Sequence, residues 1–178
     1  MGKILNIICA LTLLCTGFAA CNTAGCLENQ SSIPQAGFYS DRDSTQITVD
    51  SISVYGIGSR GDSSLLYGVK ASWVYLPLRS DMPSTSFCFR YLQKELDIPE
   101  LNDTLTIDYT SEPRFVSEEC GAMYFYTITR IAHTSHFIES VELLDSFVNN
   151  YDRERIKIYF RVAEPEDTTT ITPPEELL

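Results

Sequence analysis

The chain is poor in positive charge. Lysine and arginine number 13 against 24 aspartates and glutamates, which leaves a formal net charge of −11 at pH 7. A field of this sign repels phosphate backbones and anionic membrane surfaces. We therefore expect no nucleic-acid partner, and any attachment to a membrane must rely on something other than charge.

The sequence also lacks the common catalytic motifs. It contains no Gly-x-Ser-x-Gly elbow, no His-Glu-x-x-His pair and no Walker loop. Its two histidines, His133 and His136, stand in "HTSH". Residues three apart on a strand face opposite sides, so this pair could share a metal only if the segment bends, and no third ligand is indicated. We expect surface or turn histidines, no catalytic residue, no metal and no cofactor.

One acidic stretch, "DSFVNNYD", offers oxygen ligands at Asp145, Asn149 and Asp152. Calcium uses such ligands, but the regular spacing and the glycine of an EF-hand loop are missing. Asn149-Asn150 also suits a tight turn, which is the interpretation we favour.

The first twenty residues have a single charge, Lys3, followed by an apolar run from Ile4 to Ala20. This pattern is typical of a secretory signal and is too short for a permanent membrane span. Ala19-Ala20 precede Cys21 as in a bacterial lipobox, so we predict cleavage before Cys21 and its lipidation. The partner of the mature chain would then be the lipid bilayer, held through acyl chains. An ordinary secretory signal cleaved near Ala20 is the alternative.

Three cysteines, Cys26, Cys88 and Cys120, would remain for the mature fold. An odd number in an oxidising compartment allows three pairings. Cys120 lies in the turn-like "EECGAM" and Cys26 in a polar leader, which favours Cys26–Cys120, whereas Cys88 in "TSFCFRYL" fits a buried free thiol. Such a bridge would contribute roughly 4–5 kcal/mol in the chain-entropy model.

The hydrophobic pattern between residues 33 and 162 has a period of two. "DTLTIDYT", "RIKIYFRV" and "TSFCFRYL" alternate apolar and polar residues, as half-buried strands do, and no segment has a sustained helical stripe. We predict an all-β domain, an antiparallel sandwich of about seven to nine strands, with Trp73 in its core. A small barrel is the alternative. Residues 1–20 are the signal peptide, 21–32 a tether and 163–178 a disordered acidic tail.

Several segments carry more specific expectations. "QITVDSISVYGIG" changes phase between Val49 and Ile52, which predicts a bulge or a turn at Asp50-Ser51. "AMYFYTITRIA" is apolar on both sides, as in a central strand covered on both faces. Residues 66–76 are expected to form one strand, and residues 92–101 one short helical turn before Pro99.

Ten tyrosines, among them Tyr124, Tyr126 and Tyr159, keep a binding role open. Flat aromatic rings on the outer face of a sandwich are common in glycan- and peptide-binding modules, although tyrosines are also common in ordinary sheets. "SRGDS" contains the integrin-binding tripeptide Arg60-Gly61-Asp62, which we interpret as hairpin-turn chemistry.

The chain resembles small lipoproteins of Bacteroidota known only as a domain of unknown function. The resemblance rests on Cys21 and Cys26, "AGFYSDRD", "ISVYGIGS", "LPLRSDMPSTSFCF", "DTLTIDYTSEPRFVSEECG" and "IKIYF", in that order. It implies a bridge between Cys26 and Cys120. Surface-exported lipoproteins of that lineage usually carry acidic residues directly after the lipidated cysteine, and here the first acid is Glu28. The resemblance thus implies the periplasmic face of the outer membrane.

The sequence leads to three hypotheses about function. The first is a non-enzymatic lipoprotein of the cell envelope that acts as an interaction or accessory module for an envelope protein or glycan partner. The second is a glycan- or peptide-binding module that uses exposed tyrosines. The third, which we favour least, is a metal-dependent hydrolase centred on His133 and His136.

Overall fold

The computed structural model describes residues 31–58, 64–118 and 120–162. These residues form ten strands and one short 3-10 turn, η2 (Pro99–Leu101), and contain no α-helix. None of their helical structure is long and apolar enough to cross a membrane. The predicted signal peptide, Cys21, Cys26, the Arg60–Asp62 tripeptide and the predicted acidic tail lie outside the described residues.

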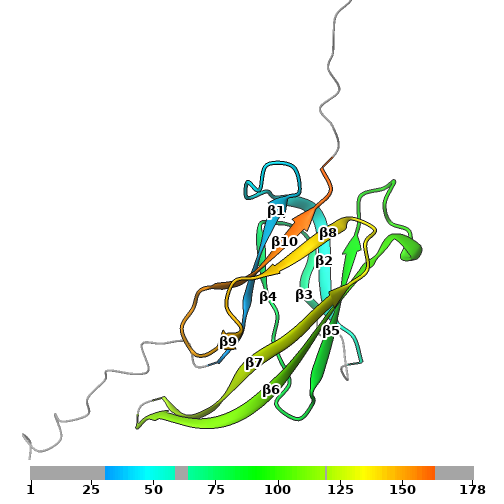
Figure 1. The fold of residues 1–178 in the computed structure, drawn as a ribbon. Coiled ribbons are helices and arrows are strands. Elements are labelled where there is room, and N and C mark those ends of the chain that lie inside the picture. The colour runs from blue at the N-terminus through cyan, green and yellow to red at the C-terminus, as the bar shows by residue number, and fades with distance from the viewer. Residues whose placement is uncertain (1–30, 59–63, 119, 163–178) are drawn as a thin grey trace, which may run out of the picture.

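The strands form two facing sheets, so the predicted all-β sandwich is confirmed and the barrel is not adopted (Figure 1). The four-stranded sheet has the order β4-β1-β10-β8, and the six-stranded sheet has the order β3-β2-β5-β6-β7-β9. The strands are β1 (Gln35–Ser40), β2 (Val49–Gly56), β3 (Ser64–Ala71), β4 (Trp73–Tyr75), β5 (Ser84–Tyr91), β6 (Asp103–Ser117), β7 (Gly121–His133), β8 (Ile138–Leu143), β9 (Phe147–Val148) and β10 (Glu154–Phe160).

The sequence predicted an antiparallel sandwich, but the four-stranded sheet also contains a parallel pair of strands. β1 and β10, the first and last strands, pair in parallel and lie side by side in its middle (Figure 1). Two parallel strands need a long connection, and here the connection from β1 to β10 consists of the rest of the domain, from β2 to β9. The first and last strands of the domain therefore hold each other in place through their hydrogen bonds.

The core follows the predicted alternation. Ile156, Ile158 and Phe160 of β10 are buried against inward residues of β5 and β6 from the other sheet. Phe38 of β1 contacts Phe89 of β5 edge-on, with ring centroids 6.4 Å apart, and so joins the two sheets through the centre. Burial of such side chains contributes about 1.5–3 kcal/mol each.

Residues 66–76 form two strands instead of one. The chain leaves the six-stranded sheet after β3, turns at Ser72 and continues as β4 in the four-stranded sheet. The Ser72 carbonyl accepts a hydrogen bond from the Phe38 amide at 2.9 Å. Strands that change sheets at a bend form the corners of sandwiches. This split and the short β9 raise the number of strands to ten.

Two predictions about burial are wrong for the same reason. Trp73 does not fill the core: it lies on the edge strand β4 with 44% of its surface exposed, while its neighbour Val74 points inward. β7 is not covered on both faces, because Tyr126 and Ile128 are buried whereas Thr127 and Thr129, on the opposite face, are exposed. Each strand has one face inside a two-layer sandwich, whatever the hydrophobicity of the other face.

The predicted irregularity in β2 is confirmed. The pairing of β2 with β3 shifts between Val49 and Ile52, and Ser51 adopts a positive φ of 54°. The predicted short turn is also present, since the Leu96 and Asp97 amides donate to the Gln93 carbonyl before η2 begins at Pro99.

β6 and β7 form a long ribbon that extends beyond the rest of the sheet (Figure 1). β5 pairs with β6 no further than Asp108, but the β6–β7 pairing continues to Ser117 and Gly121. Cys120 lies in the turn of this ribbon, at the end of the sandwich where β1 begins. Near that end the Ser32 hydroxyl contacts the Met123 sulfur at 3.8 Å.

At the opposite end a buried carboxylate, Asp103, connects the two sheets. It has no exposed surface and accepts five hydrogen bonds of 2.8–3.0 Å. The donors are the Tyr91 hydroxyl, the Thr134 hydroxyl and the amides of His136, Phe137 and Ile138. Because residues 134–138 carry the chain from β7 to β8, Asp103 holds the crossing between the sheets.

We predict that Asp103→Asn lowers the free energy of unfolding by about 3 kcal/mol in urea titrations, because an amide nitrogen would face backbone donors that lose a charged acceptor. Asp97→Asn is the matched control: Asp97 pairs with Arg90 at the surface, and its loss should cost less than about 1 kcal/mol. Equal effects of the two substitutions would contradict the role assigned to Asp103.

Candidate functional site

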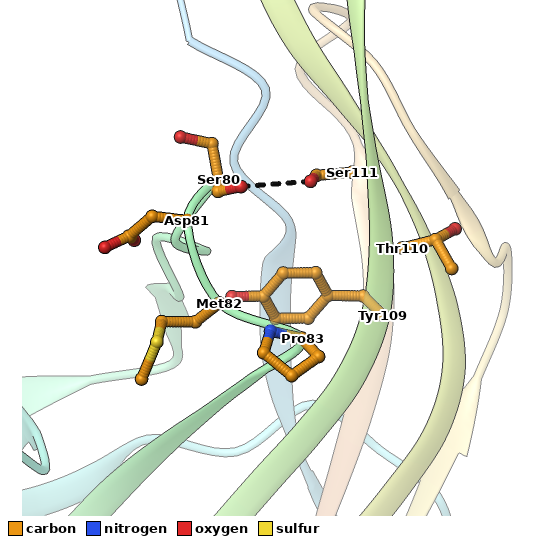
Figure 2. Close-up of a pocket in the computed structure, with 7 residues that line it drawn as sticks. All are labelled: Ser80, Asp81, Met82, Pro83, Tyr109, Thr110 and Ser111. Carbon is orange, nitrogen blue, oxygen red and sulfur yellow. Dashed lines mark hydrogen bonds between the residues drawn. The ribbon is translucent and has the colours of Figure 1, made fainter.

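A hollow of about 340 Å³ lies between β6 and the loop that connects β4 to β5 (Figure 2). The Tyr109 ring extends from β6 across the space toward the loop, and the Ser111 hydroxyl donates to the Ser80 carbonyl at 3.1 Å. The Tyr109 hydroxyl accepts from the Arg79 amide at 2.8 Å, donates to the Arg79 carbonyl and contacts Thr85. The hydrogen bonds of the Tyr109 hydroxyl therefore hold the loop between β4 and β5 in place.

Two of the three residues considered for calcium bind a cation that belongs to the chain itself. Asp145 Oδ2 and Asn149 Oδ1 both accept from the guanidinium of Arg155, which is 1% exposed. Asp152 lies apart from this cluster and accepts from the Tyr75 hydroxyl. Arg155 points inward because β10 has a bulge there, where the pairing with β1 passes from Glu154 directly to Ile156.

The electrostatics of this cluster follow from burial and charge. Burial lowers the pKa of Arg155, with the neighbouring Arg153 adding to the effect and Asp145 opposing it. A hydrogen bond from the Phe147 amide, and then the charges of the two arginines, lower the pKa of Asp145. The cluster fixes the loop between β8 and β10 through an ion pair in which Arg155 is buried and Asp145 is partly exposed.

The two histidines serve the turn that follows β7. His133 Nδ1 contacts the Thr134 carbonyl oxygen at 2.8 Å, and the His136 amide donates to Asp103. Within the described part of the chain, no three histidine, cysteine, aspartate or glutamate side chains gather as a metal site would require.

An apolar pocket of about 660 Å³ opens between the sheets at the end held by Asp103. Apolar side chains from both sheets line it: Ile47, Val49, Tyr91, Leu96, Phe137, Phe160 and Val162. The Tyr91 hydroxyl is turned away to Asp103, and burial together with that carboxylate raises its pKa. Arg161, at the rim, donates to the Ser135 and His136 carbonyls. The pocket can hold an apolar group.

The outer face of the four-stranded sheet carries four aromatic side chains, Tyr39, Trp73, Tyr75 and Tyr159, which we call the aromatic face. They come from three adjacent strands, β4, β1 and β10. The rings of Trp73 and Tyr75 lie 5.0 Å apart, and those of Tyr39 and Tyr159 lie 5.8 Å apart. Residues two apart on a strand share a face, which explains why Trp73 and Tyr75 lie together.

Gly37 shapes the middle of the aromatic face. It pairs with Trp73 of β4 and Lys157 of β10. A Cβ at this position would overlap Glu154 Oε1 and approach Cε2 of Tyr39 to 2.8 Å, so the Tyr39 ring lies directly over the glycine. A neighbouring aromatic ring often covers a strand glycine in this way.

A carboxylate holds each tyrosine of the aromatic face. The Tyr39, Tyr75 and Tyr159 hydroxyls donate to Glu154, Asp152 and Glu142 at 3.1, 2.8 and 2.7 Å. These hydrogen bonds raise the pKa of Tyr75 and Tyr159, and burial followed by the Glu154 bond raises the pKa of Tyr39. The hydroxyls therefore remain donors at neutral pH, and the rings are fixed in place.

Of the three tyrosines named from the sequence, only Tyr159 belongs to the aromatic face. Tyr124 is exposed on the β6–β7 ribbon, and Tyr126 is buried with its hydroxyl on the Leu78 carbonyl. Cys88 is a buried free thiol, as predicted, whereas Cys120 is not among the free cysteines. The spacing of Trp73 and Tyr75, two residues apart on one strand, is the signal in the sequence that could have identified the members of the aromatic face on β4.

We predict that Asp145→Asn lowers the free energy of unfolding by about 3 kcal/mol at pH 7, because Arg155 would keep a buried charge with a weaker acceptor. The lowered pKa of Asp145 means that its contribution is present above the ordinary carboxyl value of 3.8 and is lost as the pH falls below it. Urea titrations at pH 7 and pH 3 should show the difference shrinking. Asp43→Asn, an exposed carboxylate bonded to Thr45, is the control. A calcium-dependent melting temperature would contradict this account.

Comparison with known proteins identifies a family. The model of a family of unknown function (DUF6452) matches residues 51–160, which span β2 to β10 and include Asp103, Arg155, Trp73, Tyr75 and Tyr159. No curated protein and no solved structure matches the chain. The predicted resemblance to a domain of unknown function is confirmed, and the chain belongs to this family, DUF6452.

Proposed function

We propose that the protein is a non-catalytic interaction module of the cell envelope, anchored to the outer membrane through acylated Cys21. The first 21 residues support the anchor, because a short apolar run ends in small residues directly before a cysteine. The periplasmic face of that membrane is the location we favour.

The aromatic face is the observation that carries the interaction role. Four aromatic side chains on the outside of a sheet add nothing to the core, and three of them are held by carboxylates. Rigid rings with polar neighbours give contact area at a low cost in conformational entropy. This arrangement supports a ligand-binding surface, whose ligand is a glycan or a peptide. A metal-dependent hydrolase at His133 and His136 has no comparable support.

A bridge between Cys26 and Cys120 is part of the proposal. Ser32, three residues before β1, contacts Met123, which is three residues beyond Cys120 on the β6–β7 ribbon. The six residues from Cys26 to Ser32 reach about 20 Å when extended, enough for a bridge at the ribbon's turn. Cys88 is buried in the middle of β5, opposite Tyr55, and is poorly placed as a partner.

We predict that Cys21→Ser moves the protein from the membrane to the soluble fraction, because the acyl chains supply the membrane affinity. Density-gradient fractionation measures whether the protein remains with the membrane. Metabolic labelling with an alkyne fatty acid measures whether it is acylated. Cys26→Ser, five residues away, should stay labelled and membrane-bound. Membrane retention of the unlabelled Cys21→Ser protein would exclude the anchor.

We also predict that Cys88 is the one thiol that reacts with maleimide in the unfolded, unreduced lipoprotein. Cys88→Ala should leave none, and Cys26→Ser should leave two, Cys88 and Cys120. Cys26→Ser and Cys120→Ser should each destabilise the domain by about 2–5 kcal/mol. Mass spectrometry of the labelled peptides identifies the sites, and a maleimide adduct on Cys120 of the native sequence would rule out the bridge.

A further inference from the structure

We propose that the aromatic face binds a neutral glycan chain. This inference rests on the proposed function, since it names the ligand of the surface that carries the interaction role. The argument uses the ring geometry, the hydrogen-bonding capacity and the charge of the described residues.

The rings suit the apolar faces of sugars. Trp73 lies at the edge strand β4 with nearly half of its surface exposed, and it pairs with Gly37, beside which the Tyr39 ring lies. Tyr159 continues the surface on β10. Pyranose rings present flat C–H surfaces, which pack on aromatic rings of this kind.

The carboxylates suit the hydroxyl edges of sugars. Each carboxylate offers about four acceptor positions, and its tyrosine hydroxyl donates a single proton. Glu142 and Glu154 therefore keep acceptor capacity beside the rings that they hold. Hydrogen bonds from a hydroxyl to a charged carboxylate are among the stronger ones.

Charge weighs against an anionic ligand, and a lysine already placed on one ring weighs against a cationic one. The three carboxylates and the net charge of −11 repel uronates, sulfates and phosphates. A cationic side chain of a peptide could not make a cation–π contact with the Tyr39 ring, because Lys157 Nζ already lies 4.9 Å from the centroid of that ring. A polyol without charge meets neither obstacle.

The size of the face favours an oligosaccharide over a single sugar. Trp73 and Tyr159 lie two strands apart, and neighbouring strands are spaced about 4.8 Å, so the rings span roughly 10 Å across the sheet. We therefore expect affinity to rise with chain length over the first few sugar units.

The test uses the full mature chain with Cys21→Ser, so that it is soluble. Trp73 is the only tryptophan, which makes its intrinsic fluorescence a label-free report from the face itself. Neutral gluco-, manno-, galacto- and xylo-oligosaccharides of two to six units are titrated beside polygalacturonate and oligolysine. We expect a blue shift of the emission with at least one neutral series at about 1 mM or below, and none with the two ionic probes.

Variants locate the site by calorimetry. Trp73→Ala should weaken binding about tenfold, as removal of an aromatic anchor does, and Tyr39→Phe should weaken it less because the ring remains. Tyr67→Ala, which removes the most exposed tyrosine of the six-stranded sheet, is the control and should leave binding unchanged. Urea midpoints establish that each variant is folded.

Absence of binding for every neutral series at about 5 mM overturns the inference, as does tighter binding of oligolysine or equal loss in Trp73→Ala and Tyr67→Ala. The proposed function is tested separately by membrane fractionation. An anchored protein that binds no glycan would defeat this inference alone.

Discussion

The hydrogen bonds to Asp103 hold the crossing between the two sheets. Five donors converge on one carboxylate without exposed surface, and four of them come from the turn between β7 and β8. A buried carboxylate is costly unless donors surround it, so the turn and the carboxylate require each other. The apolar pocket and the order of the four-stranded sheet both depend on this turn, because it delivers β8 to the edge of β10.

A buried charge also requires surrounding hydrogen-bond partners at Arg155, where the charge is positive and the partners are acceptors. A bulge in β10 turns its guanidinium inward, and oxygens of Asp145, Asn149 and Tyr151 surround it. Two of these residues, Asp145 and Asn149, were considered as calcium ligands from the sequence, because the ligands of different cations look alike in a sequence. Which cation they surround depends on a one-residue shift in strand pairing, and that shift has no local signal.

The aromatic face shows how the rings of a flat surface can be fixed in place without a cleft. Its rings are common strand residues, and its carboxylates are part of an acidic chain. The pairing of each tyrosine with an acid far along the sequence turns them into a fixed surface. Tyr39 and Glu154 are brought together by the parallel pairing of β1 with β10, the feature of the fold that the alternating pattern could not predict.

The sequence by itself determined the all-β class, most strands, the bulge at Asp50-Ser51 and the buried sides of β5, β6 and β10, because alternation and local backbone preferences are properties of neighbouring residues. It also identified the family. The tertiary structure alone decided that Trp73 lies outside, that Asp103 and Arg155 are buried, and which tyrosines share a face. These outcomes depend on which strands meet, and strand pairing joins residues as far apart in the sequence as Tyr39 and Tyr159, which are 120 positions apart.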